Sequence, residues 1–399
     1  MNINQNDEEF YRVRSSLLPY GRQWIDEQDC QAVEKVLNSE FLTTGPMVGK
    51  FEAAVAQYTG AKYAVAFSSG TAALHAACFA AGIEEGDEVI TTPMTFAATA
   101  NCILYQKACP VFADIDPDTY NISPASISSL ITSKTKAIIP VHFTGQPANM
   151  KAIHKIAQEH NLVVIEDAAH ALGAFYNGKA VGGLNDMTMF SFHPVKHITT
   201  GEGGMITTNN PQYRDSLLKF RTHGISRNPQ DLVENHGPWY YEMEFLGFNY
   251  RMTDIQAALG ESQLTKLSGF IQRRKKYVQM YNEAFKDLKE LTIPFQDQLS
   301  DSSWHLYVIR LNLDQLKVGR KKIFESFLKA NIGVNVHYIP VYYHPFYKKL
   351  GFQKGLCPAA EKLYEEIITL PLHPSMTKQD AEDVISVTKS ILSHYSVHS

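Results

Sequence analysis

The chain has 399 residues, 44% of them apolar and 20% charged, which is typical of a globular protein with a sizeable core. A formal net charge of -4 without long runs of like charge indicates neither a nucleic-acid surface nor an anionic-membrane surface. The first 16 residues lack the apolar core of a signal peptide, and no apolar stretch approaches the roughly 20 residues that span a bilayer. We therefore expect a cytoplasmic protein whose partners are small molecules or copies of itself.

Short β-rich runs alternate with helical segments from Ala61 onward, a pattern that predicts an α/β fold with a mainly parallel sheet covered by helices on both faces. The seven predicted strands are residues 63–67, 88–92, 108–112, 137–142, 162–166, 187–192 and 204–208. Helices are predicted at residues 72–81, 95–105, 150–159 and 211–220. The sequence therefore predicts one large central sheet.

The remaining chain predicts a connecting helix and a smaller α+β domain. Residues 254–285 read as one long helix. Strands are then predicted at residues 305–311 and 333–337, and helices at residues 321–330, 359–366 and 378–392. We expect a large domain with an N-terminal arm at 1–253, a connecting helix at 254–285 and a small domain at 286–399.

The first predicted strand ends in Ser68-Ser69-Gly70-Thr71 before an Ala-rich helix. Such a turn directs backbone N–H groups and hydroxyls at one spot, where a phosphate group binds well. A serine in this position is also a common helix N-cap, and the turn alone does not decide between the two.

The buried run at residues 162–165 ends in Glu166-Asp167-Ala168-Ala169-His170, at the end of a strand where α/β proteins build their sites. In the functional interpretation, Asp167 pairs with the protonated nitrogen of a pyridine ring, as carboxylates do in enzymes that use pyridoxal phosphate (PLP). A capping role for Asp167 is equally open. His170 contacts the same ring or has a structural role.

One lysine lies in a glycine-rich loop after a strand, in the segment from Phe190 to Gly204. Lys196 suits a Schiff base, because a desolvated lysine loses its proton more easily and the neutral amine attacks aldehydes. The alternative is a solvated surface lysine. His193 and His197 stand four residues apart, but Pro194 between them argues against a helix that would bind a metal, and we predict no metal site.

Taken in this order, Ser69-Gly70-Thr71, Asp167-x-x-His170 and Ser191-x-x-x-x-Lys196 resemble the nucleotide-sugar aminotransferases of the DegT/DnrJ/StrS type, which are fold type I PLP enzymes. Further similar stretches include residues 41–46, 93–96, 247–251 and 335–338. The resemblance runs nearly end to end. It implies a large PLP-binding domain, a smaller C-terminal domain and PLP as the cofactor.

The resemblance also implies roles for particular residues. Lys196 would hold the cofactor and act as the catalytic residue. The other expected cofactor-binding residues are Ser69, then Gly70, Thr71 and Ser191 at the phosphate, Phe96 stacked on the ring, Asp167 at the ring nitrogen, His170 beside the phenolic oxygen and, from the partner subunit in a homodimer with shared sites, Asn249. The family includes a dehydratase branch with histidine in place of the lysine, so Lys196 favours transamination.

Within this family, the chain resembles enzymes that transfer the amino group of L-glutamate to C4 of a UDP-linked 4-keto-6-deoxy-N-acetylhexosamine for pseudaminic acid-type glycans. His337 and Tyr338 follow a predicted strand and suit a sugar, and Arg251, with Arg221 and His223, suits a diphosphate or the glutamate carboxylates. Domain packing and surface ion pairs are the alternatives for these residues.

Three other functions remain open from the sequence. In the first, the chain is an aminotransferase for another nucleotide-linked keto sugar, such as a dTDP- or GDP-linked 4-keto sugar or a 3-keto sugar. Alternatively, the chain is a PLP-binding regulator without turnover, since one fold supports several functions. In the third, Ser69, Asp167 and Lys196 form no joint site and the chain is a structural α/β module.

Overall fold

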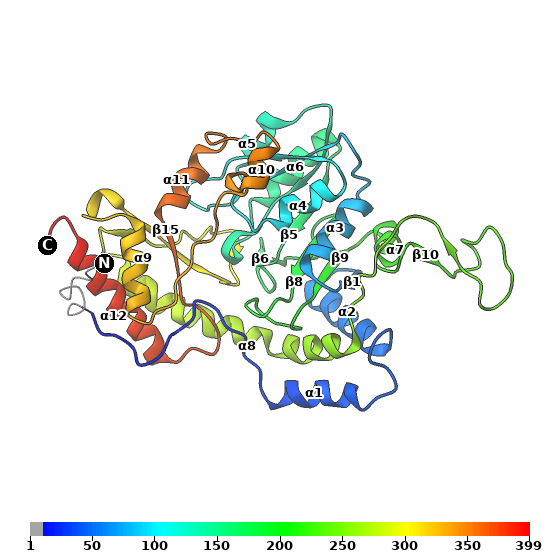
Figure 1. Cartoon of the computed structure of the whole chain (residues 1–399), viewed down its shortest axis with the longest axis horizontal. Helices are drawn as coiled ribbons and strands as arrows, with labels where there is room; N and C mark the ends of the chain where they lie inside the picture. The colour runs from blue at the N-terminus through cyan, green and yellow to red at the C-terminus, as the bar shows by residue number, and fades with distance from the viewer. Residues whose placement is uncertain (1–10) are drawn as a thin grey trace.

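The computed structural model describes residues 11–399 (Figure 1). The first ten residues, which belong to the predicted N-terminal arm, lie outside the described residues. Within residues 11–399, no helix is long and apolar enough to cross a membrane.

The centre of the fold is a seven-stranded sheet with the order β1-β9-β8-β5-β4-β2-β3. Its strands are β1 (Tyr63–Phe67), β2 (Glu88–Thr91), β3 (Cys109–Phe112), β4 (Thr135–Ile139), β5 (Val163–Asp167), β8 (Met187–Ser191) and β9 (Gly204–Thr208). Strand β9 runs antiparallel to both of its neighbours, and the other neighbouring strands pair in parallel. The prediction of a large, mainly parallel sheet is confirmed.

Helices cover both faces of this sheet, because successive side chains of a buried strand point to opposite sides. Val89 and Ile165 pack on one face, against helices α3 (Gly70–Ala80), α4 (Ala98–Tyr105) and α7 (Pro211–Phe220). Ile90 and Val164 pack on the other face. That second face is covered by α2 (Pro46–Thr59), α5 (Pro124–Leu130), α6 (Met150–His160) and the start of α8 (Asp254–Phe285).

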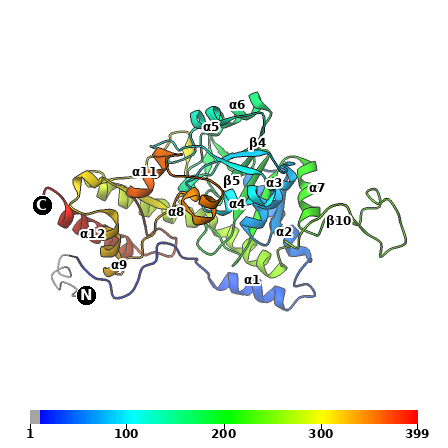
Figure 2. The ribbon, with the colours of Figure 1, turned by 45° about the horizontal axis from the view of Figure 1, so that its top comes forward.

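Helix α8 leads from the central sheet to the C-terminal part of the chain (Figures 1 and 2). It begins with a capping box, in which the Thr253 hydroxyl accepts from the backbone of Gln256 and the Gln256 side chain accepts from the backbone of Thr253. Helix α1 (Glu27–Leu37) packs along it.

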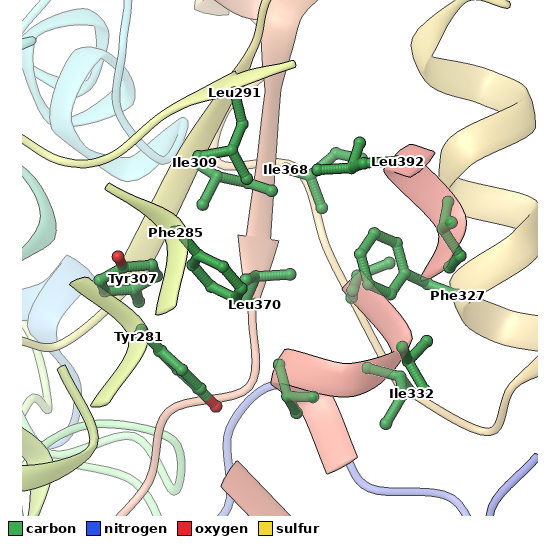
Figure 3. Packing of buried hydrophobic residues seen from close by; sticks show 14 of the residues in the cluster. Tyr281, Phe285, Leu291, Tyr307, Ile309, Phe327, Ile332, Ile368, Leu370 and Leu392 are labelled. Carbon is green, nitrogen blue, oxygen red and sulfur yellow. The ribbon is translucent and has the colours of Figure 1, made fainter. Parts of the chain in front are cut away.

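A second core lies in the C-terminal part, where the end of α8 packs against a three-stranded antiparallel sheet (Figure 3). Tyr281 and Phe285 of α8 contact this core, and Phe327 enters it from the opposite side. The elements here are β12 (Leu291–Thr292), β14 (Tyr307–Leu311), β15 (Ile367–Leu370), α9 (Arg320–Lys329), α10 (Pro345–Lys349), α11 (Pro358–Glu366) and α12 (Lys378–Tyr395).

The remaining elements are short. They are the hairpin β6 (Phe175–Tyr176) and β7 (Lys179–Ala180) with β13 (Ser300–Asp301), the pair β10 (Ile225–Ser226) and β11 (Glu242–Met243), and the 3₁₀ turns Phe143–Gly145, Leu313–Gln315 and Val341–Tyr343. The segment between β10 and β11 extends away from the rest of the chain in both views (Figures 1 and 2).

Some expected elements differ from the structure. The strand predicted at residues 333–337 is wrong: Asn335 forms a single bridge to Thr369, and its side chain accepts from the backbone N–H of Val336, so the local backbone turns instead of joining a ladder. The prediction missed several elements, among them α1, α2, α5, α10 and β15, and α4 starts three residues later than predicted. The division of the chain into two domains and a connecting helix stays a prediction.

Candidate active site

The carboxyl ends of β1, β5 and β8 meet at one cavity, and the segment after β2 joins them there. Its volume is about 540 Å³, within the range of small-molecule sites. Segment 335–338 of the C-terminal part also lines the cavity. Around it lie the sequence-predicted residues Ser69, Gly70, Thr71, Phe96, Asp167, His170, Ser191, Lys196, His337 and Tyr338. The idea that Ser69, Asp167 and Lys196 form no joint site is therefore wrong.

The turn from β1 into α3 presents helix N–H groups to the cavity. The Ser69 hydroxyl accepts from the N–H of Ala72, so the capping role is real, and the hydroxyl keeps its own proton to donate. The N–H groups of Gly70 and Thr71 belong to the first turn, which has no intrahelical acceptors for them. A Cβ on Gly70 would lie 3.3 Å from the Ser191 hydroxyl oxygen, so a side chain there would crowd this side of the cavity.

Two adjacent carboxylates of β5 point to opposite faces of the sheet. Glu166 lies on the face away from the cavity, where His142 Nε2 is 2.7 Å from it and Thr188 donates to it at 2.7 Å. Burial raises the pKa of Glu166, but these hydrogen bonds outweigh burial and lower it. Asp167 lines the cavity and accepts from the Ala169 N–H at 3.1 Å, and burial raises its pKa. The structure thus directs Asp167, and not Glu166, at a ligand.

Lys196 lies in the loop after β8 and lines the same cavity. Burial lowers the pKa of its amine to about 8, although the negative charge of Asp167 acts in the opposite direction. At pH 7.5 this shift increases the neutral fraction from roughly 0.1% to roughly 25%. A lysine with a pKa in this range is a suitable nucleophile toward an aldehyde.

Because the neutral amine is the reactive form, labelling of Lys196 in the cofactor-free protein should rise with pH around a midpoint of about 8. Competitive labelling with acetic anhydride, read by peptide mass spectrometry from pH 6 to pH 11, measures this midpoint. Lys155 on α6, with a side chain that is 78% exposed, serves as the internal reference. A midpoint near 10.5, the ordinary value for lysine, would contradict the effect of burial.

An imidazole and a phenol connect the two sides of the cavity. Tyr338 Oη lies 2.9 Å from His170 Nε2, and the two rings stack with their centroids 5.9 Å apart. Burial lowers the pKa of His170 well below its usual range and raises that of Tyr338, so both groups are neutral at physiological pH. His337 is 2.8 Å from the Thr369 hydroxyl through Nδ1, and burial lowers its pKa to about 3.

Two predicted residues do not line the cavity of their own chain. Asn249 is exposed and pairs with Thr222 in an isolated bridge, and Arg251 is half-buried. The carbonyl of Tyr250 between them accepts from the backbone N–H of Ser68, directly after β1. A role across a dimer stays a prediction for them.

Arg221 is engaged elsewhere. Its guanidinium forms an ion pair of 2.6 Å with Glu52 and donates to the Ala66 carbonyl. The ion-pair alternative is therefore the one that the structure supports for this residue.

The histidines of the lysine loop have different surroundings. His193 is exposed at the cavity, whereas His197 is buried and its Nε2 lies 3.1 Å from the carbonyl of Ser303. In the part of the chain that the structure describes, no group of three or more His, Cys, Asp or Glu side chains could hold a metal ion.

Several cavity residues were missed from the sequence, among them Tyr20, Thr95, Thr99 and the buried His305. Tyr20 comes from the N-terminal segment, with its ring centroid 5.2 Å from that of His337. Thr95 and Thr99 are both buried, and their hydroxyl oxygens lie 2.7 Å apart. The spacing of four residues at the start of a predicted helix was the one available signal for the two threonines.

The groups around the cavity fit PLP. Asp167 is a buried carboxylate that suits a protonated ring nitrogen, and Lys196 supplies a nearby amine of lowered pKa. The buried Nδ1 of His170 has no hydrogen-bond partner among residues 11–399, so it is free for a further polar group. A lysine and a carboxylate at one site are the groups that PLP-dependent enzymes use to hold their cofactor.

The chain belongs to the DegT/DnrJ/EryC1/StrS aminotransferase family, whose profile matches residues 23–389. It is 42% identical to the spore coat polysaccharide biosynthesis protein SpsC of Bacillus subtilis, over 95% of this chain and 98% of SpsC. Among solved structures it is similar to Helicobacter pylori PseC, an aminotransferase of pseudaminic acid biosynthesis, with a TM-score of 0.88 and 35% identity over 95% of this chain and all of PseC.

Spr1654 of Streptococcus pneumoniae also has a TM-score of 0.88, with 31% identity over 95% of this chain and 99% of its own. It has been solved with PLP and in the PMP form. The chain is accordingly a PLP-dependent sugar aminotransferase with a fold type I architecture, which confirms the predictions of family, enzyme class and cofactor. The family therefore indicates an enzyme and not a PLP-binding regulator without turnover.

Proposed function

We propose that this aminotransferase moves the amino group of L-glutamate to C4 of a UDP-linked 4-keto-6-deoxy-N-acetylhexosamine, giving a 4-amino sugar for pseudaminic acid-type glycans. The observation that carries the reaction type is the meeting of Lys196 and Asp167 at one cavity. The choice of acceptor is supported by the likeness to PseC over nearly the whole chain.

PLP supplies an electron sink for the carbon that gains or loses the amino group. Lys196 holds the cofactor and moves the proton at that carbon, which a neutral amine of lowered pKa can accept. Asp167 keeps the ring nitrogen protonated. The phosphate is bound by Ser69, Gly70, Thr71 and Ser191, and the ring is bound by Phe96 and His170.

The sugar is bound, in this proposal, on the side formed by His337 and Tyr338. Both are neutral, so they orient hydroxyl and carbonyl groups without adding charge. Phe96, whose ring centroid is 6.5 Å from that of Tyr338, is 64% exposed and offers its ring for stacking on the cofactor. We further propose a cytoplasmic homodimer in which Asn249 and Arg251 of each subunit serve the site of its partner.

A second candidate acceptor is another nucleotide-linked keto sugar, with dTDP or GDP in place of UDP or with the keto group at C3. The likeness to SpsC, which is named for spore coat polysaccharide biosynthesis, favours keeping this candidate. The residues at PLP would be the same for either acceptor, so only the sugar side of the cavity distinguishes them.

The test is a panel of UDP-, dTDP- and GDP-linked 4-keto and 3-keto sugars supplied with L-glutamate. We expect the UDP-linked 4-keto-6-deoxy-N-acetylhexosamine to have a kcat/KM at least about 100-fold above the others, because a site that hydrogen-bonds one substrate rejects analogues that leave its polar groups unpaired. NMR of the product locates the new amine. A dTDP- or GDP-linked sugar as the best acceptor would refute the proposed substrate and leave the reaction type intact.

A further inference from the structure

Two threonine hydroxyls form a chain of hydrogen bonds that ends on Asp167. Thr99, in the first turn of α4, donates to Asp167 Oδ2 at 2.7 Å. Thr95 precedes α4, and its hydroxyl oxygen is 2.7 Å from that of Thr99. This series of hydrogen bonds therefore joins the segment after β2 to the end of β5. Thr99 and Asp167 are 68 residues apart in sequence.

The hydroxyl protons of Thr95 and Thr99 have one possible arrangement when Asp167 is ionised. A carboxylate only accepts, so the single hydroxyl proton of Thr99 goes to Asp167. The hydroxyl of Thr95 must then donate to Thr99. Because the Ala169 N–H holds the other carboxylate oxygen at 3.1 Å, both oxygens of Asp167 are fixed by groups from two different elements.

These bonds are shielded from bulk water, since Thr99 is fully buried and Thr95 and Asp167 are 3% and 5% exposed. A hydrogen bond to a charged acceptor is strong in such surroundings, and neighbouring bonds strengthen it further. Burial alone raises the pKa of Asp167, and the hydroxyl of Thr99 is the largest influence that lowers it again.

We propose that Thr99 is a positioning residue for the cofactor: its hydroxyl holds the Asp167 carboxylate ionised and aimed into the cavity, and Thr95 supports it. The inference rests on the proposed role of Asp167 at the ring nitrogen of PLP. Thr99 itself need not touch the reacting atoms.

The alternative is that Thr99 only packs the start of α4. Valine keeps the branched shape of threonine and removes the hydroxyl, whereas serine keeps the hydroxyl and removes the methyl group. The pair Thr99→Val and Thr99→Ser therefore separates hydrogen bonding from packing. Thr99→Ala provides a second variant without the hydroxyl should the valine variant fold poorly.

The experiment uses the holoenzyme with PLP labelled at its ring nitrogen. Nitrogen NMR reports whether that nitrogen is protonated, and an absorbance titration gives the affinity for PLP. We expect Thr99→Val to bind PLP roughly tenfold more weakly and to shift the ring-nitrogen resonance toward the unprotonated position. Thr99→Ser should stay close to the parent in both readouts, and Thr95→Val should show a smaller change of the same sign.

Asp167→Ala, measured beside these variants, separates two kinds of failure. If Asp167→Ala moves the resonance and Thr99→Val and Thr99→Ala do not, the positioning role of Thr99 is wrong. The same conclusion follows if Thr99→Ser loses as much as Thr99→Val. If Asp167→Ala itself leaves the resonance unchanged, the proposed role of Asp167 fails, and the inference about Thr99 fails with it.

Discussion

Replacing Lys196 with alanine should lower turnover by roughly 1,000-fold or more, because one side chain both holds the cofactor and moves the proton. The variant should also lose the visible absorption band of the covalently held cofactor. Steady-state assay with L-glutamate and the acceptor sugar measures the first effect, and absorbance spectroscopy measures the second.

Folding should survive this change. Burial disfavours the charged form of Lys196, so at pH 7 its amine lowers the free energy of unfolding of the cofactor-free protein. Alanine removes this penalty. We expect the melting temperature of the cofactor-free variant to equal or exceed that of the parent. Lys155→Ala on the exposed face of α6 is the matched control and should keep full activity. A Lys196→Ala enzyme within tenfold of the parent rate would refute the assigned role.

The second large effect is expected for Asp167→Asn, which keeps the shape of the side chain and removes its charge. Without the carboxylate, the ring nitrogen of the cofactor loses its counter-charge, and kcat should fall on the order of 100-fold. The negative charge of Asp167 also raises the pKa of Lys196, so the labelling midpoint of Lys196 in the cofactor-free variant should fall below 8.

Glu166→Gln provides the control for Asp167→Asn, because the two carboxylates are neighbours on β5 and face opposite sides of the sheet. Glu166 bonds to His142 and Thr188, away from the cavity. Its loss should lower the melting temperature and leave the protonation of the cofactor ring unchanged. Equal effects of the two variants on the cofactor would show that Asp167 has no specific role there.

Much of the site could be predicted because it follows the strands. The apolar run of β5 ends at Asp167 and that of β8 at Ser191, and parallel strands bring their carboxyl ends to one edge of the sheet. Apolar runs of this kind are strong sequence signals, so the order of the motifs already indicated a common site.

Other features depend on contacts that no local pattern contains. The bond from Thr99 to Asp167 joins residues from separate strand-helix units, and the tilted contact between the rings of Tyr20 and His337 joins the N-terminal segment to the C-terminal part. Segment 333–337 was predicted as a strand from its composition, yet its polar groups bond locally or to β15. Composition alone does not reveal such local bonding.

The most direct test of the proposed reaction is the visible spectrum of the holoenzyme during two additions. L-glutamate should bleach the absorption band of the bound cofactor, and a UDP-linked 4-keto-6-deoxy-N-acetylhexosamine should then restore it, since the amino group passes from donor to cofactor to sugar. A band that bleaches and does not return with this sugar would contradict the proposed acceptor. A band that glutamate leaves unchanged would contradict the proposed donor.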